Sequence, residues 1–168
     1  MDKKLRWLKL RVMRLKPLEE IPESRRGKAR ELLVEYQLLA YGETENPVKE
    51  AYFVGDKICI IELENGTVKR VPIEVKPPWV KIGKNFLNEF KGIYVIIIQP
   101  KESVAEYDFL VFTSREMYLK VHKKGTPGIH DKAHKEKRWH LRIPNNHKGF
   151  EEYVDRWNKI VDYAEGRE

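Results

Sequence analysis

One dipeptide, Asn65-Gly66, limits what this chain can fold into more than any other feature of its sequence. It separates two stretches rich in β-branched and aromatic residues, 52–64 and 67–76. Asn-Gly is the strongest short signal for a hairpin, because both residues tolerate the positive φ angles that a tight turn requires. We therefore expect two antiparallel strands over these stretches, joined at Asn65-Gly66.

The length of that turn decides which side chains of the hairpin share a face. A two-residue loop places Asp56 opposite Val75, so that Asp56 and Glu74 point to opposite sides of the sheet. A three-residue loop with Gly66 in the left-handed region instead places Asp56 opposite Glu74, with both carboxylates on one face. A bulge near Pro72 would also change the register, because proline marks an edge strand or an irregularity. The sequence leaves these alternatives open.

A helix is expected over residues 25–41, with Ser24 as its N-cap and Gly42 as its end. Its predicted apolar stripe consists of Leu32, Tyr36 and Leu39 with Ala29, Leu33 and Ala40.

Apolar periodicity predicts further elements after the hairpin, whose second strand ends at Pro77-Pro78. The continuous apolar run over 93–99 indicates a strand buried on both faces. Residues 3–16 fit either a strand or one face of a helix. The remaining expected elements are a short helix over 84–90, a strand over 107–113, a helix over 115–122 capped by Ser114, a loop over 123–138, a strand over 139–143 and a helix over 148–164. The fold class that follows is α/β, with a mixed central β-sheet flanked by helices.

The composition suits one domain, since 41% of the 168 residues are hydrophobic. The apolar runs are too short to span a membrane, and no secretory signal is evident near Met1. The single cysteine, Cys59, cannot form an internal disulfide and is expected in the core. These features predict a soluble protein of the cytoplasm.

The net charge of +7 is distributed unevenly along the chain. Residues 1–30 carry 11 Lys and Arg against 4 Asp and Glu, and residues 118–148 carry 9 against 2. Each of these segments has a balance of +7, so the remainder of the chain has −7. Basic segments attract polyanions, because contacts with phosphates release counterions. We expect DNA as the partner, with RNA as an alternative polyanion; the simpler interpretation is two solvated, lysine-rich surfaces.

Two acids and a lysine gather at corresponding ends of the two hairpin strands: Asp56, Glu74 and Lys76. Because Glu74 and Lys76 are two residues apart on a strand, they share a face. Two carboxylates can hold Mg²⁺, and a neighbouring ammonium can orient water and stabilise negative charge, which is what phosphodiester hydrolysis requires. The alternative is that Asp56 is a turn residue and that the other two form the solvated face of an ordinary hairpin.

These residues resemble the signature of the PD-(D/E)XK nucleases, the restriction-endonuclease-like superfamily. Asp56 matches the family's Asp, and Glu74 and Lys76 match its Glu-x-Lys. The segment from Gly27 to Leu32 is similar to the first helix of archaeal Holliday-junction resolvases, where the matching residue is Glu31. The chain departs from the pattern at Gly55, which replaces the family's Pro, and at the Pro77-Pro78 break.

The resemblance covers residues 24–99 and implies a Mg-dependent endodeoxyribonuclease. It implies a metal, Mg²⁺ or Mn²⁺, held by Asp56, Glu74 and Glu31, with Lys76 acting on the water, and a homodimer as the working form. Residues 1–22 would then form a basic arm or strand, 24–99 the catalytic core, and 100–168 a C-terminal extension of the same domain. A nucleic-acid-binding module without catalysis is the alternative.

The extension contains five histidines within 26 residues: His122, His130, His134, His140 and His147. The spacing of His130 and His134 suits zinc on a helix, but Gly125, Pro127 and Gly128 disfavour a long helix there. A loop that contacts DNA explains this region better, since the histidines are interspersed with lysines. The predicted nucleic-acid contacts are Lys123, Lys124, Lys132, Lys135, Lys137 and Arg138, with Trp139 as a stacking residue.

Overall fold

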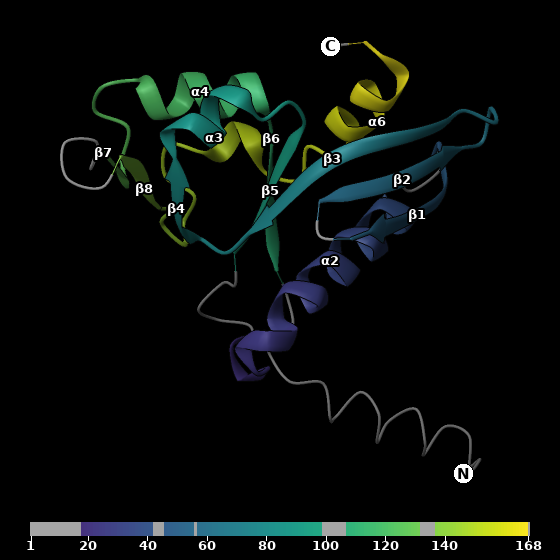
Figure 1. Ribbon diagram of the computed structural model, residues 1–168, viewed down its shortest axis with the longest axis horizontal. Helices are drawn as coiled ribbons and strands as arrows, with labels where there is room; N and C mark the ends of the chain where they lie inside the picture. The colour runs from purple at the N-terminus through teal and green to yellow at the C-terminus, as the bar shows by residue number, and fades with distance from the viewer. Residues whose placement is uncertain (1–17, 42–45, 56, 99–106, 132–136, 168) are drawn as a thin grey trace.

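The structure is a computed structural model that describes residues 18–41, 46–55, 57–98, 107–131 and 137–167. It confirms the α/β class, with a mixed five-stranded sheet flanked by helices (Figure 1). The elements are η1 (Leu18–Glu20), α2 (Glu23–Ala40), β1 (Val48–Val54), β2 (Ile58–Leu63), β3 (Val68–Lys76), β4 (Trp79–Gly83), α3 (Lys84–Glu89), β5 (Ile93–Ile98), β6 (Asp108–Thr113), α4 (Ser114–His122), β7 (Ile129–Asp131), β8 (Arg138–Arg142), η2 (Glu151–Tyr153) and α6 (Asn158–Glu165). The predicted element over 3–16 and the predicted stop Gly42 lie outside the described residues.

The five-stranded sheet has the order β1-β2-β3-β5-β6. The first three strands form an antiparallel meander, β3 runs parallel to β5, and β5 is antiparallel to β6. A second, three-stranded sheet has the order β4-β8-β7 and lies at one end of the molecule (Figure 1). No helix in the described ranges is both long enough and apolar enough to cross a membrane.

The hairpin of β2 and β3 adopts the register with the three-residue turn. The Leu63 N–H donates to the Thr67 carbonyl (2.8 Å), and Gly66 has a φ of 83°. The same register extends to the other end, where the Ile73 N–H donates to the Lys57 carbonyl (2.8 Å). The prediction of a single strand over 52–64 was wrong, because Gly55 has a φ of 68° and starts a turn that separates β1 from β2.

Pro72 lies in the part of β3 that pairs only with β2, so the predicted edge position is confirmed there, whereas the alternative of a bulge is wrong. It pairs regularly with Ile58 of β2. Backbone donors alternate in direction along a strand, and that of Ile73 points to β2, so the missing donor of Pro72 faces β5. Pairing with β5 begins only at Ile73 and Ile93, and the proline therefore interrupts no ladder. Gly92 allows the close approach here, since a Cβ on it would lie 2.3 Å from the Pro72 carbonyl oxygen.

Two apolar clusters cover the two faces of the sheet. The first core joins α2 and α6 to the sheet and includes Val34, Leu38, Ile73, Val95, Trp157 and Ile160. The second core lies under α3, α4, η2 and the three-stranded sheet and includes Tyr94, Phe112, Trp139, Leu141, Phe150 and Tyr153. The β5 strand is buried on both faces, as predicted. Cys59 is also buried as predicted, and burial raises the pKa of its thiol to about 12.

The helix predicted over 25–41 is confirmed as α2, but its N-cap is Pro22 and not Ser24. Its buried side chains are Val34 and Leu38, whereas much of the predicted stripe faces solvent: Leu32 is 52% exposed, Tyr36 64% and Leu39 47%. The reason is tertiary. The Phe53 N–H donates to the Glu35 carboxylate (2.7 Å), which fixes the rotation of the helix on β1.

The helix predicted over 148–164 is instead two short segments, η2 and α6. Asp155 interrupts it with a φ of 50°, and its N–H donates to the Phe109 carbonyl of β6 (2.8 Å). The interruption lets the first segment contribute Phe150 and Tyr153 to the second core, while the second contributes Trp157 to the first core.

The α4 helix begins with a capping box formed by Thr113 and Glu116, and the expected cap Ser114 is its first residue. We predict that Thr113→Ala lowers the free energy of unfolding by about 1 kcal/mol, because it leaves the Glu116 N–H without its acceptor. Urea unfolding followed by circular dichroism measures this. Ser114→Ala is the matched control and should change stability by less; equal effects would contradict the assignment of the cap.

Candidate active site

The β3 strand presents Glu74 and Lys76 on one face of the sheet, as the sequence predicted from their spacing. Val71 and Ile73 alternate with them and belong to the first core on the other face. Glu74 is only 5% exposed and is the single charged residue among the buried residues of the described chain. In the parallel pairing of β3 with β5 it lies beside Tyr94, a member of the second core.

Two lysines flank the Glu74 carboxylate. Lys76 Nζ lies 2.5 Å from Oε1, and Lys57 Nζ lies 3.3 Å from Oε2. Lys57 also lies over the ring of Phe86, 4.6 Å from its centroid. Both ammonium groups reach solvent, with side-chain exposures of 51% for Lys57 and 30% for Lys76. A buried anion is therefore held under two cations that water and a ligand can reach.

Two buried oxygens at this site lack a hydrogen-bond partner in the described structure: Oε2 of Glu74 and the hydroxyl of Tyr94. Burial, with a further contribution from the Glu74 carboxylate, raises the pKa of Tyr94 above its usual range. The phenol therefore stays protonated and can donate a hydrogen bond. Oε2 of Glu74 still has its ion pair with Lys57, whereas the hydroxyl of Tyr94 has neither a hydrogen bond nor an ion pair. Buried polar groups in folded proteins almost always have partners, so this hydroxyl indicates a position for water or a ligand.

The acids predicted to join Glu74 differ in where they lie. Asp56 is outside the described residues, although the register that would place it opposite Glu74 is the one adopted from Lys57 to Thr67. Glu31 lies on α2, which covers the opposite face of the sheet, and its carboxylate pairs with Lys28 (3.2 Å). Glu35, one helical turn after Glu31, accepts a hydrogen bond from the Phe53 N–H of β1 (2.7 Å). The structure thus brings together Glu74 and Lys76 and places Glu31 in another layer.

The site offers part of what a divalent metal requires. Glu74 has a carboxylate oxygen without a hydrogen-bond partner, a hard ligand of the kind that Mg²⁺ prefers. Within the described ranges, no group of three His, Cys, Asp or Glu side chains is arranged to hold a metal. The fit therefore rests on Glu74 with Asp56 as the expected second carboxylate.

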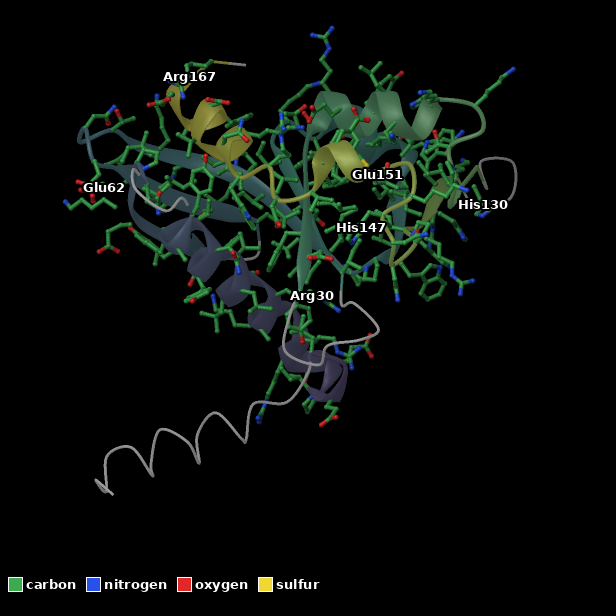
Figure 2. All side chains as sticks on the ribbon, turned by 180° about the vertical axis from the view of Figure 1, so that it is seen from behind. Arg30, Glu62, His130, His147, Glu151 and Arg167 are labelled. Atoms are coloured by element: carbon green, nitrogen blue, oxygen red, sulfur yellow. The ribbon has the colours of Figure 1, made fainter. Side chains whose placement is uncertain are left out.

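The described histidines of the C-terminal extension lie on several different elements. His122 stacks on Tyr118, His147 lies 3.1 Å from Asp108, and His130 pairs with His140 between β7 and β8. Figure 2 shows His130 and His147 well apart. The loop predicted over 123–138 contains a short strand, β7, in its described part.

The predicted nucleic-acid contacts are partly accessible. Lys123, Lys124, Lys137 and Arg138 are exposed, while Lys132, Lys135 and His134 lie outside the described residues. Trp139 is only 9% exposed and packs in the second core, so the structure does not support its predicted role in stacking. The exposed tryptophan of the same sheet is Trp79, at 63%.

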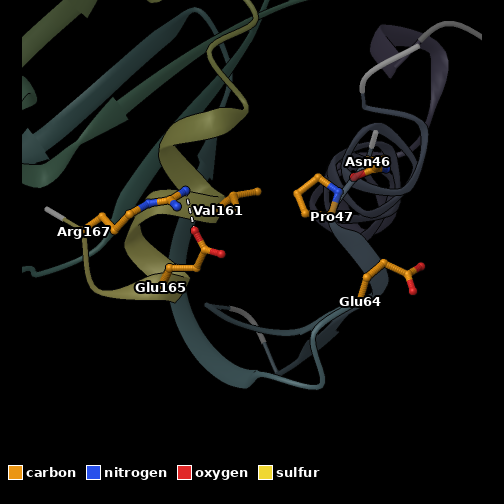
Figure 3. Close-up of a pocket in the computed structure, with 6 residues that line it drawn as sticks. All are labelled: Asn46, Pro47, Glu64, Val161, Glu165 and Arg167. Carbon is orange, nitrogen blue, oxygen red and sulfur yellow. Dashed lines mark ion pairs between the residues drawn. The ribbon is translucent and has the colours of Figure 1, made fainter. Parts of the chain in front are cut away.

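A hollow lies on the side of the first core, between the start of β1 and the end of α6 (Figure 3). Its lining residues are Asn46, Pro47, Glu64, Val161, Glu165 and Arg167. Their polar groups have local roles, since Asn46 donates to the last carbonyls of α2 and Arg167 pairs with Glu165 and Asp162. The hollow therefore offers no chemistry comparable with the Glu74 site.

Two residues of the site, Lys57 and Tyr94, were not among the predicted ones. Lys57 directly follows Asp56, and its position could have been inferred from the three-residue turn. Tyr94 joins the site through the parallel pairing of β3 and β5, for which the sequence gives no local signal.

No protein-family model matches the chain, and comparisons with curated proteins and with solved structures give no match either.

Proposed function

We propose that this protein is a metal-dependent endodeoxyribonuclease whose active centre consists of Glu74, Lys76 and Asp56. The observation that carries the proposal is the buried Glu74 carboxylate, which lies beside two ammonium groups that are accessible to solvent. Burying a charge costs free energy that a solvated hairpin would avoid. A buried carboxylate that lies beside positive groups is typical of an active or binding site.

The order of the elements supports the same proposal. The restriction-endonuclease-like core is expected to run from a helix to a strand bearing Asp, a strand bearing Glu-x-Lys, a helix and a strand. Here α2 is followed by β2, which Asp56 precedes, then by β3 with Glu74 and Lys76, then by α3 and β5. In this scheme β1 and β4 are additional strands.

The proposed chemistry assigns a role to each side chain. Glu74 and Asp56 would hold Mg²⁺ or Mn²⁺, which when bound supplies a water of lowered pKa and a positive charge near the phosphate. Lys76 would hold that water in line and stabilise the negative charge that develops on the phosphate oxygens. Lys57 adds a second positive charge on the same face. The protonated hydroxyl of Tyr94 would donate to a bound oxygen. Glu31, on the helix that covers the opposite face of the sheet, is not included in this centre.

The basic segments would hold the DNA backbone, and the resemblance to nucleases that cut both strands favours a homodimer. The second candidate is a nucleic-acid-binding module without catalysis. One observation favours this module. Glu74 forms ion pairs with both Lys57 and Lys76, so its negative charge is compensated without a metal.

A metal-dependence experiment separates the two candidates. We predict that at least one of three DNA forms, supercoiled, linear or branched, is cleaved with Mg²⁺ or Mn²⁺ and stays intact in excess chelator. Both cations suit carboxylate oxygens. DNA binding in chelator, measured by fluorescence anisotropy, should persist and serves as the control for folding. Binding without cleavage under any of these conditions would favour the module, and cleavage in chelator would exclude the proposed centre.

A further inference from the structure

The three-stranded sheet β4-β8-β7 has two very different faces. Side chains alternate between them along each strand. The inward positions are apolar and belong to the second core: Val80, Ile82, Trp139 and Leu141. The outward positions are Trp79, Lys81, Arg138, His140, Arg142 and, from β7, His130. We refer to these six residues as the outer face.

The outer face is cationic. Its cross-strand pairs are Trp79 with Arg142, Lys81 with His140, and His140 with His130. Three of the six residues carry a full positive charge at neutral pH, two are histidines, and none is acidic. Rows of cations without acids favour a polyanionic partner.

Trp79 gives the outer face a second property. Its side chain is 63% exposed, the largest apolar group that the sheet leaves in contact with water. Arg142 lies directly opposite it in the antiparallel register. An indole ring beside a guanidinium on a flat sheet surface can stack on a planar base while the cation contacts the adjoining phosphate.

We propose that the outer face binds single-stranded nucleic acid, with a base stacked on Trp79 and the phosphates held by Lys81, Arg138 and Arg142. A duplex is disfavoured, because its paired bases are stacked on one another and present no free ring face to Trp79. The proposal does not depend on the proposed cleavage, since binding requires neither the metal nor Glu74.

The outer face adjoins the Glu74 site through the chain itself. Trp79 follows Lys76 by three residues, so their Cα atoms are at most about 11 Å apart. The edge of the outer face at Trp79 is therefore close along the chain to the Glu74 site. If the proposed cleavage also holds, this favours substrates with a single-stranded segment next to the scissile phosphate.

The experiment measures binding of labelled 20-nucleotide oligo(dT), oligo(U) and a 20-base-pair duplex by fluorescence anisotropy, in excess chelator. We expect Trp79→Ala to weaken binding to the single strands by about 5- to 150-fold, the range for removal of one stacked base. Trp79→Phe, which keeps a ring, should remain within a few-fold of wild type. The two single strands distinguish DNA from RNA.

Charge is tested separately. Lys81→Ala/Arg142→Ala should reduce the slope of log K against log salt by about 0.7 for each phosphate that the variant no longer neutralises. Controls on the larger sheet and α2 match the residue types: Tyr36→Ala removes an aromatic ring that is 64% exposed, and Lys49→Ala/Lys69→Ala removes two exposed charges. Both controls should bind as wild type does.

Three results would overturn the proposal. The first is an unchanged affinity of Trp79→Ala for both single strands. The second is an equal loss of affinity for duplex and single strands, which would assign the face to duplex DNA. The third is a loss in Trp79→Phe as large as in Trp79→Ala at an unchanged melting temperature, which would exclude stacking. These binding measurements can be made even if no DNA is cleaved, so the binding proposal and the cleavage proposal can be rejected independently.

Discussion

Replacing Glu74 by Gln should reduce DNA cleavage by about 100-fold or more while the protein remains folded and still binds DNA. The amide keeps the shape of the side chain but removes the charge that a cation requires, and removal of one electrostatic group from an active centre typically has an effect of this size. Cleavage rates under single-turnover conditions measure the reduction. Lys76→Ala should have a comparable effect, because its ammonium lies 2.5 Å from the same carboxylate.

The fold should tolerate Glu74→Gln, because the two lysines that lose their partner are not deeply buried. Breaking a fully buried ion pair is strongly destabilising, since it leaves an uncompensated charge. Here Lys57 and Lys76 have side-chain exposures of 51% and 30%, so both can be hydrated again. The melting temperature of the variant, and its affinity for DNA in chelator, check that only the chemistry is affected.

The chain offers a matched control in Glu62 on β2. Its carboxylate also pairs with a lysine, Lys49, at 2.6 Å, but it is more exposed and lies away from Lys76. Glu62→Gln should cleave DNA at the wild-type rate. Full activity in Glu74→Gln, or an equal reduction in both variants, would remove Glu74 from the proposed active centre.

The largest expected effect on stability is that of Phe112→Ala, at about 3–5 kcal/mol. Phe112 is fully buried in the second core, where it stacks on Tyr153 (ring centroids 4.1 Å apart) and meets Phe150 edge to face (6.2 Å). The truncation removes these ring interactions and leaves a cavity between β6 and η2 that their main chains cannot close. Urea unfolding gives the change in the free energy of unfolding.

Leu119→Ala is the control for this measurement. Leu119 lies on α4, next to the same core, but its side chain is 58% exposed. Its truncation should cost well under 1 kcal/mol, since it uncovers little buried area. Similar destabilisation of the two variants would mean that the second core is not packed as described.

Local signals predicted those elements whose structure depends on neighbouring residues. The apolar run of β5, the hairpin around Asn65-Gly66 and the helix over 25–41 are all confirmed with small shifts of their ends. The last helix is different, because its interruption at Asp155 is fixed by a hydrogen bond to β6, a strand more than forty residues earlier. The short strand β7 has too few residues to show a periodicity.

The same distinction applies to the candidate site. The shared face of Glu74 and Lys76 follows from alternation along one strand, and it was predicted. The proximity of Tyr94 requires knowledge that β5 runs parallel to β3, which no local pattern contains. The orientation of β8 was also ambiguous, because alternation allows either Trp139 or its neighbours to face inward. In the structure, Trp139 faces inward and packs in the second core, and Trp79 is the exposed tryptophan of the second sheet.

The interrupted C-terminal segment bears on how the protein reaches this fold during synthesis. Phe150 and Tyr153 complete one core, and Trp157 and Ile160 complete the other. Both faces of the sheet therefore stay incompletely covered until these residues have left the ribosome. Domains generally fold as units once their whole core is available, and exposed apolar strands in unfinished chains are prone to aggregation. The nascent chain would thus keep apolar strands exposed until residues 150–160 have emerged, and would then close both cores in a single late step.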